Sequence, residues 1–358
     1  MRVAVYTIAL NELQFVESWY NSAKEADYLL IADTGSTDGT KEKALELGIN
    51  VVDVVVKPWR FDMGRNASLA AVPKDIDYCI SLDMDEVLLP GWRQHLEEAF
   101  KNGWTRPRYQ YTWNWNADGS PGLQYAGDKI HARFGYRWKH PVHEVLTNYG
   151  DVQETQGFVG LEIHHHADNT KTRSQYLPLL KFAVDEDPWD DRNTFYYARE
   201  LYYYGRYSEA IPEFKRHLGL PRATWAPERA ASMRFLGKME TDKAEYWFRK
   251  AIQEAPGRRE PHCDLANYYY TRGEWDKCLE SAKAALEIKD KPLEYLCEGP
   301  AWSWVPYDLA AIASYKLGRY DDALEYGKKA VDASPSDQRL RENVVWYSSP
   351  PSDQQPSS

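Results

Sequence analysis

The sequence predicts two regions of different fold class: an α/β region with a mostly parallel sheet, followed by an all-α array of helical repeats. Across residues 1–170, short β-branched runs alternate with helix-like stretches, which is typical of βαβ units. Beyond residue 190, small residues recur with a step of 34 positions. The chain has 358 residues, of which 43% are hydrophobic and 27% charged, so it can form two separate cores.

The α/β region is expected to contain strands at residues 3–8, 28–32, 51–56 and 78–82. Helices are expected between them, at residues 13–24 and 41–47. Ligands of such sheets gather at the carboxyl ends of the strands. The polar residues that follow each run are therefore the candidate site.

The repeat region is defined by a ladder of small side chains. Ala210, Ala244 and Cys278 follow one another at this constant step, and a further copy at residues 315–335 comes after an insertion that includes residues 298–302. Small residues let two antiparallel helices approach closely, and the pattern resembles the tetratricopeptide repeat. We expect helical repeats that form an extended concave surface.

These patterns divide the chain into four segments. They are an α/β domain at residues 1–170, a connecting helix or linker at 171–192, repeats at 193–347, and a Ser/Pro/Gln-rich tail at 348–358 that we expect to be disordered.

Composition excludes several classes of protein. The net charge is −10, and residues 1–170 carry 16 Lys and Arg against 24 Asp and Glu, which disfavours a nucleic-acid partner. No run of apolar residues is long enough to predict a membrane span. The N-terminus reads as a strand, not as a signal peptide, and the four cysteines have no metal-site or disulfide-framework spacing. We expect a cytoplasmic protein with reduced thiols.

Polar motifs follow three of the expected strands. Asn11 and Glu12 follow the first, and DTGSTDGT at residues 33–40 follows the second; its small residues allow close approach of a ligand, although such a turn can also be only a helix cap. LDMDE at residues 82–86 follows the fourth. Its three carboxylates repel one another unless a cation lies among them; the alternative is an acidic helix N-terminus.

Taken together, the motifs resemble those of family 2 glycosyltransferases, the inverting group with the A fold (GT-A). The matching segments are residues 11–12, 33–40, WRFDMGRN at 59–66, LDMDEVL at 82–88 with the DxD signature, HPVHEV at 140–145 and IHHH at 163–166. The resemblance covers about residues 1–170. With the repeats that follow, the chain is similar to a bacterial and phage subgroup that includes a peptide S-glycosyltransferase.

The resemblance implies a nucleoside-diphosphate sugar as donor, with uracil as the base in most relatives, and Mn²⁺ or Mg²⁺ as cofactor. Asp85 would be a metal ligand and part of the catalytic centre, and Asp83 would bind the ribose or the metal. His165 or His164 would complete the protein ligands, since successive histidines of a strand cannot all face one side. The residues implied in donor binding are Thr7, Asn11, Glu12, Asp33, Arg65 and Asp83.

Two of these roles have structural alternatives. Arg65 suits a diphosphate by charge and fork geometry, but it could instead form a salt bridge with Asp62. Glu144 is the expected general base that takes the acceptor proton, and otherwise a charge in the first turn of a helix.

Aromatic residues concentrate between residues 104 and 138. Alternation places Tyr109, Tyr111, Trp113 and Trp115 on one face of a strand. That face either packs against a neighbouring element or forms an acceptor cleft.

The sequence therefore predicts a metal-dependent inverting glycosyltransferase that moves a sugar, from a UDP donor by resemblance, to a protein, peptide or glycan acceptor. The repeats would present the acceptor or mediate homo-oligomerisation. Two alternatives stay open: a non-catalytic scaffold with a degenerate transferase domain, and a phage DNA-base glycosyltransferase.

Overall fold

The computed structural model describes residues 1–116, 118–168 and 174–348. The chain forms two compact units, one of Met1–Pro188 with Leu293–Tyr295 and one of Trp189–Pro292 with Leu296–Ser358. Part of the predicted linker, residues 171–173, and the predicted tail from residue 349 onward lie outside the described residues. Within the described part of the chain, no helix is both long and apolar enough to cross a membrane.

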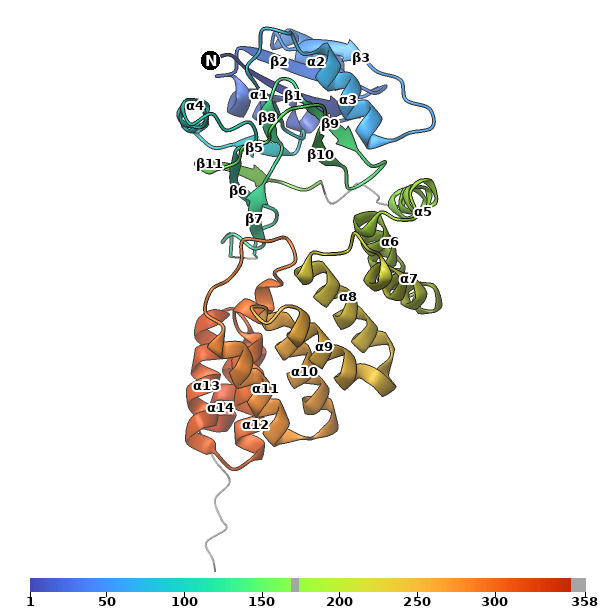
Figure 1. Cartoon of the computed structure of the whole chain (residues 1–358). Coiled ribbons are helices and arrows are strands. Elements are labelled where there is room, and N and C mark those ends of the chain that lie inside the picture. The colour runs from blue at the N-terminus through green and yellow to red at the C-terminus, as the bar shows by residue number, and fades with distance from the viewer. Residues whose placement is uncertain (117, 169–173, 349–358) are drawn as a thin grey trace, which may run out of the picture. The chain divides into compact units, whose positions relative to one another are not determined.

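The first unit is built on a five-stranded sheet with the order β3-β2-β1-β4-β8 (Figure 1). Its strands are β1 (Val3–Ala9), β2 (Tyr28–Asp33), β3 (Asn50–Asp53), β4 (Tyr78–Ser81) and β8 (Ile130–Ala132). Its helices are α1 (Leu13–Ala23), α2 (Thr40–Glu46), α3 (Phe61–Ala71) and α4 (Trp92–Lys101). β1 to β4 are parallel and β8 is antiparallel, so the α/β class is confirmed.

The third strand is shorter than the run at residues 51–56 predicts. β3 ends at Asp53, where it pairs with Asp33, the last residue of β2. Beyond that point the amide of Val54 still donates to the carbonyl of Asp33 at 2.8 Å, but β2 has ended, and Val55 is 79% exposed. A β-branched run alone does not show where its neighbouring strand ends.

A second sheet has the order β5-β11-β6-β7, and a hairpin joins β9 to β10. These strands are β5 (Glu86–Leu88), β6 (Arg108–Thr112), β7 (Gln124–Gly127), β9 (Tyr136–Lys139), β10 (Val145–Asn148) and β11 (Phe158–His165). The antiparallel pairing of β11 with β5 places His165 opposite Glu86. The histidine run therefore lies beside the acidic motif. Helix α5 (Tyr176–Glu186) completes the unit.

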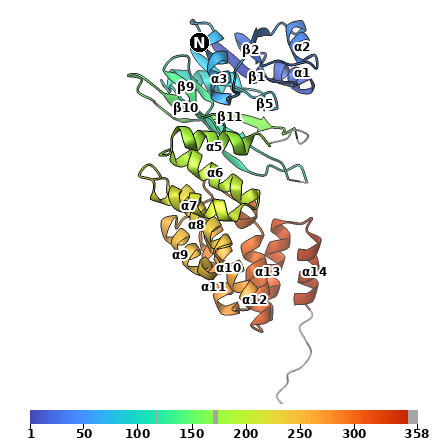
Figure 2. The ribbon, with the colours of Figure 1, turned by 90° about the vertical axis from the view of Figure 1, so that its right-hand side faces the viewer.

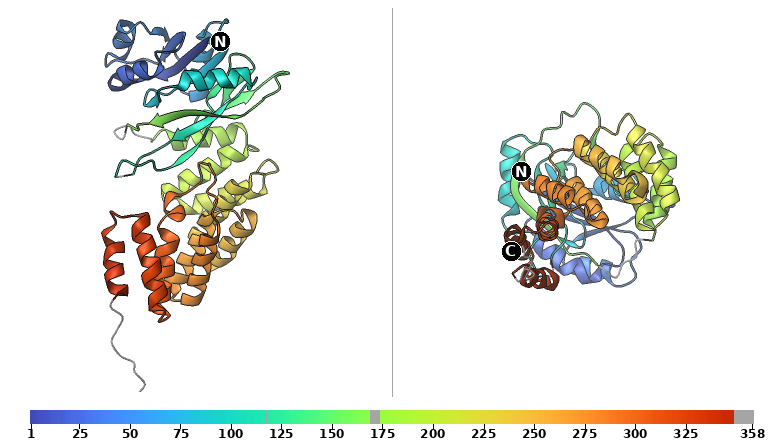
Figure 3. Two further views of the ribbon diagram at one scale, coloured as in Figure 1. Left: turned by 90° about the vertical axis from the view of Figure 1, so that its left-hand side faces the viewer. Right: turned by 90° about the horizontal axis from the view of Figure 1, so that it is seen from below.

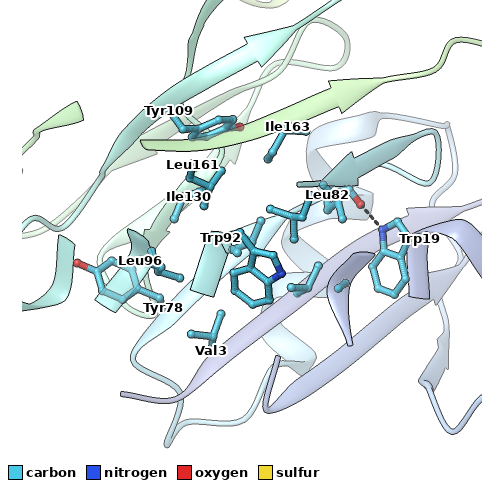
Figure 4. Close-up of a cluster of buried hydrophobic side chains, with 14 of the residues drawn as sticks. Val3, Trp19, Tyr78, Leu82, Trp92, Leu96, Tyr109, Ile130, Leu161 and Ile163 are labelled. Carbon is cyan, nitrogen blue, oxygen red and sulfur yellow. Dashed lines mark hydrogen bonds between the residues drawn. The ribbon is translucent and has the colours of Figure 1, made fainter. Parts of the chain in front are cut away.

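The core of the first unit lies between the two sheets and α1 and α4 (Figure 4). Trp19 and Trp92 are its largest fully buried side chains. The indole Nε1 of Trp19 donates a hydrogen bond to the carbonyl of Leu82 at 2.9 Å. This bond satisfies the polar end of a buried indole and fixes the backbone where the acidic motif begins.

The second unit consists of helices that follow one another as antiparallel pairs (Figures 2 and 3). They are α6 (Asp191–Tyr203), α7 (Tyr207–Gly219), α8 (Ala226–Met239), α9 (Ala244–Glu254), α10 (Arg259–Arg272), α11 (Trp275–Glu287), α12 (Val305–Lys316), α13 (Tyr320–Ala333) and α14 (Gln338–Tyr347). Ala210, Ala244, Cys278 and Ala323 lie on the second helix of their pairs and are buried. The predicted helical repeats are confirmed.

Turn chemistry explains where the pairs differ. Gly205, Gly273 and Gly318 have positive φ angles near 70° and reverse the chain between the helices of their pairs. The second pair has Met239 and Thr241 in this region, and the short 3₁₀ helix η1 (Thr241–Lys243) joins α8 to α9. A second 3₁₀ helix, η2 (Gly299–Trp302), lies in the insertion before α12.

A buried hydrogen-bond chain links three strands of the first unit. The indole of Trp138 donates to the hydroxyl of Tyr6 at 2.8 Å, and that hydroxyl lies 3.1 Å from Nε2 of His131. Nδ1 of His131 bonds the carbonyl of Ala132 at 2.8 Å. Burial lowers the pKa of His131 to about 3, so its ring is neutral. Its Nε2 therefore accepts a hydrogen bond from the hydroxyl of Tyr6.

This chain makes stability depend on pH. In the unfolded chain the pKa of His131 is near 6.5, so between pH 6.5 and 3 the unfolded state binds more protons than the folded state. The contribution of His131 to stability is therefore complete above pH 6.5 and falls as the pH drops. We expect His131 to remove about 1.4 kcal/mol of the free energy of unfolding per pH unit in this range. Urea unfolding at pH 7, 6 and 5 measures the slope. In His131→Gln the free energy of unfolding should depend less steeply on pH, by the equivalent of one bound proton. Equal slopes in the variant and the wild type would contradict the assignment.

Candidate functional site

The parallel strands β1, β2 and β4 end at one edge of the sheet, where the predicted motifs follow. The loop at residues 33–40 is held by hydrogen bonds to the segment after β1. Asn11 Oδ1 accepts from the amide of Thr37 at 2.8 Å, and the amide of Glu12 donates to Thr40 Oγ1 at 2.8 Å. Asn11 adopts a positive φ of 55° to do so. Asn11 and Glu12 thus brace this loop, whatever they contact in a ligand.

Only one of the two carboxylate oxygens of Asp33 is hydrogen-bonded. Its Oδ2 accepts hydrogen bonds from the amides of Gly35 and Ser36, each at 3.0 Å, whereas its Oδ1 is buried and has no partner among the described residues. A buried acceptor without a donor costs about 1–3 kcal/mol. A ligand that brings an N–H or O–H group to Oδ1 would recover this cost. Thr7, another predicted donor contact, is only 1% exposed within β1.

Arg65 lies at the centre of the site. Its Nε donates to Glu144 Oε1 at 2.5 Å, and its Nη1 donates to Asp83 Oδ1 at 2.6 Å. The guanidinium also lies 5.1 Å from the ring centre of Trp138. Burial alone would lower the pKa of Arg65, but the charges of Asp83 and Glu144 outweigh it and raise that pKa well above its usual value.

The alternative salt bridge of Arg65 with Asp62 is wrong. Asp62 pairs with Arg60 at 2.9 Å, and Arg60 also pairs with Glu186 at 2.7 Å. Arg60, which precedes α3 in an extended conformation, and Arg65 within α3 therefore have separate partners.

The three carboxylates after β4 are compensated unequally. Asp83 accepts from Arg65 and from Lys129 Nζ at 2.7 Å. Glu86 accepts from the same Lys129 at 2.8 Å and from the hydroxyl of Tyr111 at 2.5 Å. Asp83 and Asp85 lie between β4 and β5, and Glu86 is the first residue of β5, so the alternative of an acidic helix N-terminus is wrong.

The charged groups of this cluster shift one another's pKa values. Burial raises the pKa of Glu86, whereas the pKa of Asp83 stays below its usual value because Arg65 and Lys129 outweigh the effect of burial. Burial would lower the pKa of Lys129, but the two carboxylates raise it. The lysine therefore remains a cation that neutralises both acids.

Asp85 has a histidine as its partner. Its Oδ2 lies 3.2 Å from Nε2 of His165. Nδ1 of His165 bonds the carbonyl of Trp113 at 2.8 Å, and the Trp113 ring stacks on the imidazole with centroids 4.4 Å apart. Burial would lower the pKa of His165, but the hydrogen bond to Asp85 raises it. The Nδ1 contact orients the ring so that Nε2 faces the Asp85 carboxylate.

His164 is not brought to Asp85. It alternates to the other face of β11, where its Nε2 lies 2.8 Å from Glu162 Oε1. Within residues 1–116, 118–168 and 174–348, no three His, Cys, Asp or Glu side chains form a complete metal site. An imidazole and a carboxylate are nonetheless suitable donors for Mn²⁺ or Mg²⁺. Asp85 and His165 would hold such a cation only together with further ligands from substrate or water.

Glu144 directly precedes β10, so the alternative of a charge in a first helical turn is wrong. Its side chain is 11% exposed and meets Arg65 through Oε1. The predicted aromatic face divides: Tyr109 and Tyr111 are buried in the core, whereas Trp113 and Trp115 flank the histidines. Packing accounts for Tyr109, whereas Tyr111 packs in the core and also reaches the site through its hydroxyl, which donates to Glu86.

Lys129 and Trp138 are the site residues that the motifs did not identify. Lys129 lies between β7 and β8, at sequence separations of 46 from Asp83 and 43 from Glu86. Its only signal in the sequence is the excess of basic residues around it. Trp138 is placed by Asn66, whose amide exchanges two hydrogen bonds of 2.9 Å with the backbone of Trp138.

The fold and site define a ligand-binding α/β domain joined to a helical repeat unit. Residues 4–135 match the family Glycosyl transferase family 2. The chain thus carries a family 2 glycosyltransferase domain, and its enzyme class is glycosyltransferase. A search of the curated proteins found no match.

Solved structures that are similar to part of this chain include those of three proteins. A thermophilic TPR protein of Thermus thermophilus is 21% identical, over 48% of this chain and 88% of that one, with a TM-score of 0.34. PilF of Pseudomonas aeruginosa is 17% identical, over 47% and 72%, with a TM-score of 0.37. Yeast Tom70 is 17% identical, over 50% and 36%, with a TM-score of 0.38.

The site predicts a large stability effect at Arg65. Arg65→Gln leaves the largely buried Glu144 without its cation and leaves Asp83 with Lys129 alone, so we expect the free energy of unfolding to fall by about 3–5 kcal/mol. Urea denaturation of the full chain measures this. The exposed Arg137→Gln serves as the matched control, with an expected change within about 0.5 kcal/mol. Similar losses for both variants would show that Arg65 is not the centre of the cluster.

Proposed function

We propose that the chain transfers a sugar, with inversion, from a nucleoside-diphosphate donor to a protein, peptide or glycan acceptor, with Mn²⁺ or Mg²⁺ as cofactor. The unpartnered Oδ1 of Asp33 carries the donor proposal. It lies at the sheet edge where nucleotides bind in such folds, and it accepts the imide proton of a uracil or a ribose hydroxyl. A UDP-sugar is therefore the proposed donor.

The charged groups support the diphosphate end of the same donor. Arg65 uses Nε and Nη1 for protein contacts, and among the described residues its Nη2 makes no hydrogen bond. A guanidinium that is held in place but keeps a free donor suits a phosphate oxygen. Asp85 and His165 would hold the metal ion, which stabilises the charge that develops on the leaving diphosphate.

Glu144 is the proposed general base for the acceptor hydroxyl or thiol. Arg65 holds its Oε1, so the carboxylate has a fixed orientation. Trp113 and Trp115 would border the acceptor side, since they surround the histidines of β11. The net charge of −10 disfavours DNA as the acceptor. We further propose a cytoplasmic location, where the four buried, unbridged cysteines stay reduced, and self-association through the repeats.

The proposal predicts that the metal site depends on one histidine. The assay is a thermal shift with UDP-sugars and Mn²⁺, in which ligand at 100 times its Kd adds about 2.7 kcal/mol to the free energy of unfolding. EDTA should remove the part of this stabilisation that depends on Mn²⁺. His165→Ala should lose that part because it removes the ligand that faces Asp85. The matched variant His164→Ala should keep it. Mn²⁺-dependent stabilisation that survives in His165→Ala, or disappears in His164→Ala, would overturn the assignment.

A second prediction concerns the base. Glu144→Gln keeps the shape of the side chain but cannot accept a proton, so we expect kcat to fall by about 10²–10⁴-fold. Donor binding, measured by the same thermal shift, should change much less. The readout is release of nucleoside diphosphate in the presence of acceptor. Turnover within threefold of the wild type would exclude Glu144 as the base.

A further inference from the structure

The second unit contains a cavity that the helical repeats do not fill. It has a volume of about 460 Å³, within the range of small-ligand sites. Its lining residues come mainly from α10 and α12, the first helices of two successive pairs, with Arg234 from α8 and Arg339 from α14. The lining includes Asn267, Tyr270, Trp304, Asp308, Ile312 and Arg339.

One wall of the cavity comes from residues 298–304, in the insertion that breaks the repeat period. This wall is fixed by Glu260, whose Oε1 accepts from the amide of Glu298 at 2.9 Å and from the indole of Trp302 at 2.8 Å. Arg234 adds a two-pronged bond to the Glu298 carboxylate at 2.8 and 3.0 Å. The wall is therefore a built part of the unit.

The charged side chains of the lining are paired within the protein. The sets are Arg234 with Asp264 and Glu298, Arg258 with Glu260, and Arg339 with Asp308. An ionic ligand would have to compete with the protein's own counter-charges, which already compensate each of these side chains. The cavity is thus matched to an uncharged, polar occupant.

The groups that remain for a ligand are an amide and aromatic rings. Asn267 is exposed, and its carboxamide has no hydrogen bond to any described residue. Tyr270, one turn away on α10, is 38% exposed. Trp304 packs one face against the guanidinium of Arg339, at 5.4 Å. A flat aromatic surface beside an amide suits a ligand with C–H faces and hydroxyl edges.

We propose that this cavity binds an uncharged saccharide. The inference extends the proposed function, because the saccharide would belong to the acceptor or to its glycosylated product. An uncharged peptide is the competing occupant, but its amide groups need several partners in a row, whereas Asn267 is the one unpaired carboxamide among the described lining residues.

The test is direct binding to the full chain. Saturation-transfer difference NMR is recorded with cellopentaose, maltopentaose and chitopentaose, and separately with an uncharged Gly/Ser decapeptide. We expect at least one saccharide to bind, with affinity at least tenfold weaker in Asn267→Ala and Tyr270→Ala. Tyr246→Ala is the matched control, since Tyr246 is 51% exposed on α9 and outside the cavity lining, and it should bind normally.

Excess UDP with Mn²⁺ separates this site from the transferase domain. If the saccharide signal survives UDP but is lost in Asn267→Ala, the cavity is the site, whether or not the donor proposal holds. The proposal is overturned if no saccharide binds, if the two cavity variants bind as the wild type does, or if only the decapeptide binds with this dependence on Asn267 and Tyr270.

Discussion

The ion pairs of Arg65 organise the first unit, because a buried guanidinium must be compensated by acids from elsewhere in the chain. Its partners Asp83 and Glu144 lie 18 and 79 residues away in the sequence. Bringing them together fixes the end of β4, the N-terminal half of α3 and the segment before β10 relative to one another. Lys129 then neutralises Asp83 and Glu86, so Asp85 is left to face His165. The distribution of counter-charges thus selects the carboxylate that is available to a cation.

The surroundings of Arg65 make this arrangement rigid. Trp138 covers the guanidinium and is held through its backbone by Asn66 and through its indole by Tyr6. Tyr6 and His131 are fully buried and neutral, so each of their hydrogen bonds has a fixed donor and a fixed acceptor. The groups of the candidate site therefore rest on side chains that are themselves held by buried hydrogen bonds, which is the condition for a preorganised site.

The two units place their candidate sites by different means. In the first, the edge of a parallel sheet gathers loops from several strands. In the second, one helix of each pair faces a shared surface, and an insertion held by Glu260 encloses part of it. A departure from the repeat period is therefore informative about function in such arrays, since a regular repeat leaves an open surface and the extra residues shape it.

Local patterns in the sequence determined the fold class of both regions, the four parallel strands of the first sheet, the helical repeats, and the position of three motifs at strand ends. They did not predict the second sheet, in which β11 pairs with β5 and β6 across long sequence separations. Alternation along β11 also indicated that successive histidines could not share one face, but it did not decide between His164 and His165. Only the tertiary structure showed which histidine meets Asp85, that Arg65 pairs with Asp83 and Glu144 and not with Asp62, and that Lys129 joins the cluster. The reason is physical: periodicity and turn chemistry are fixed by neighbours in the chain, whereas the partner of a buried charge is chosen by packing between segments that are far apart in sequence.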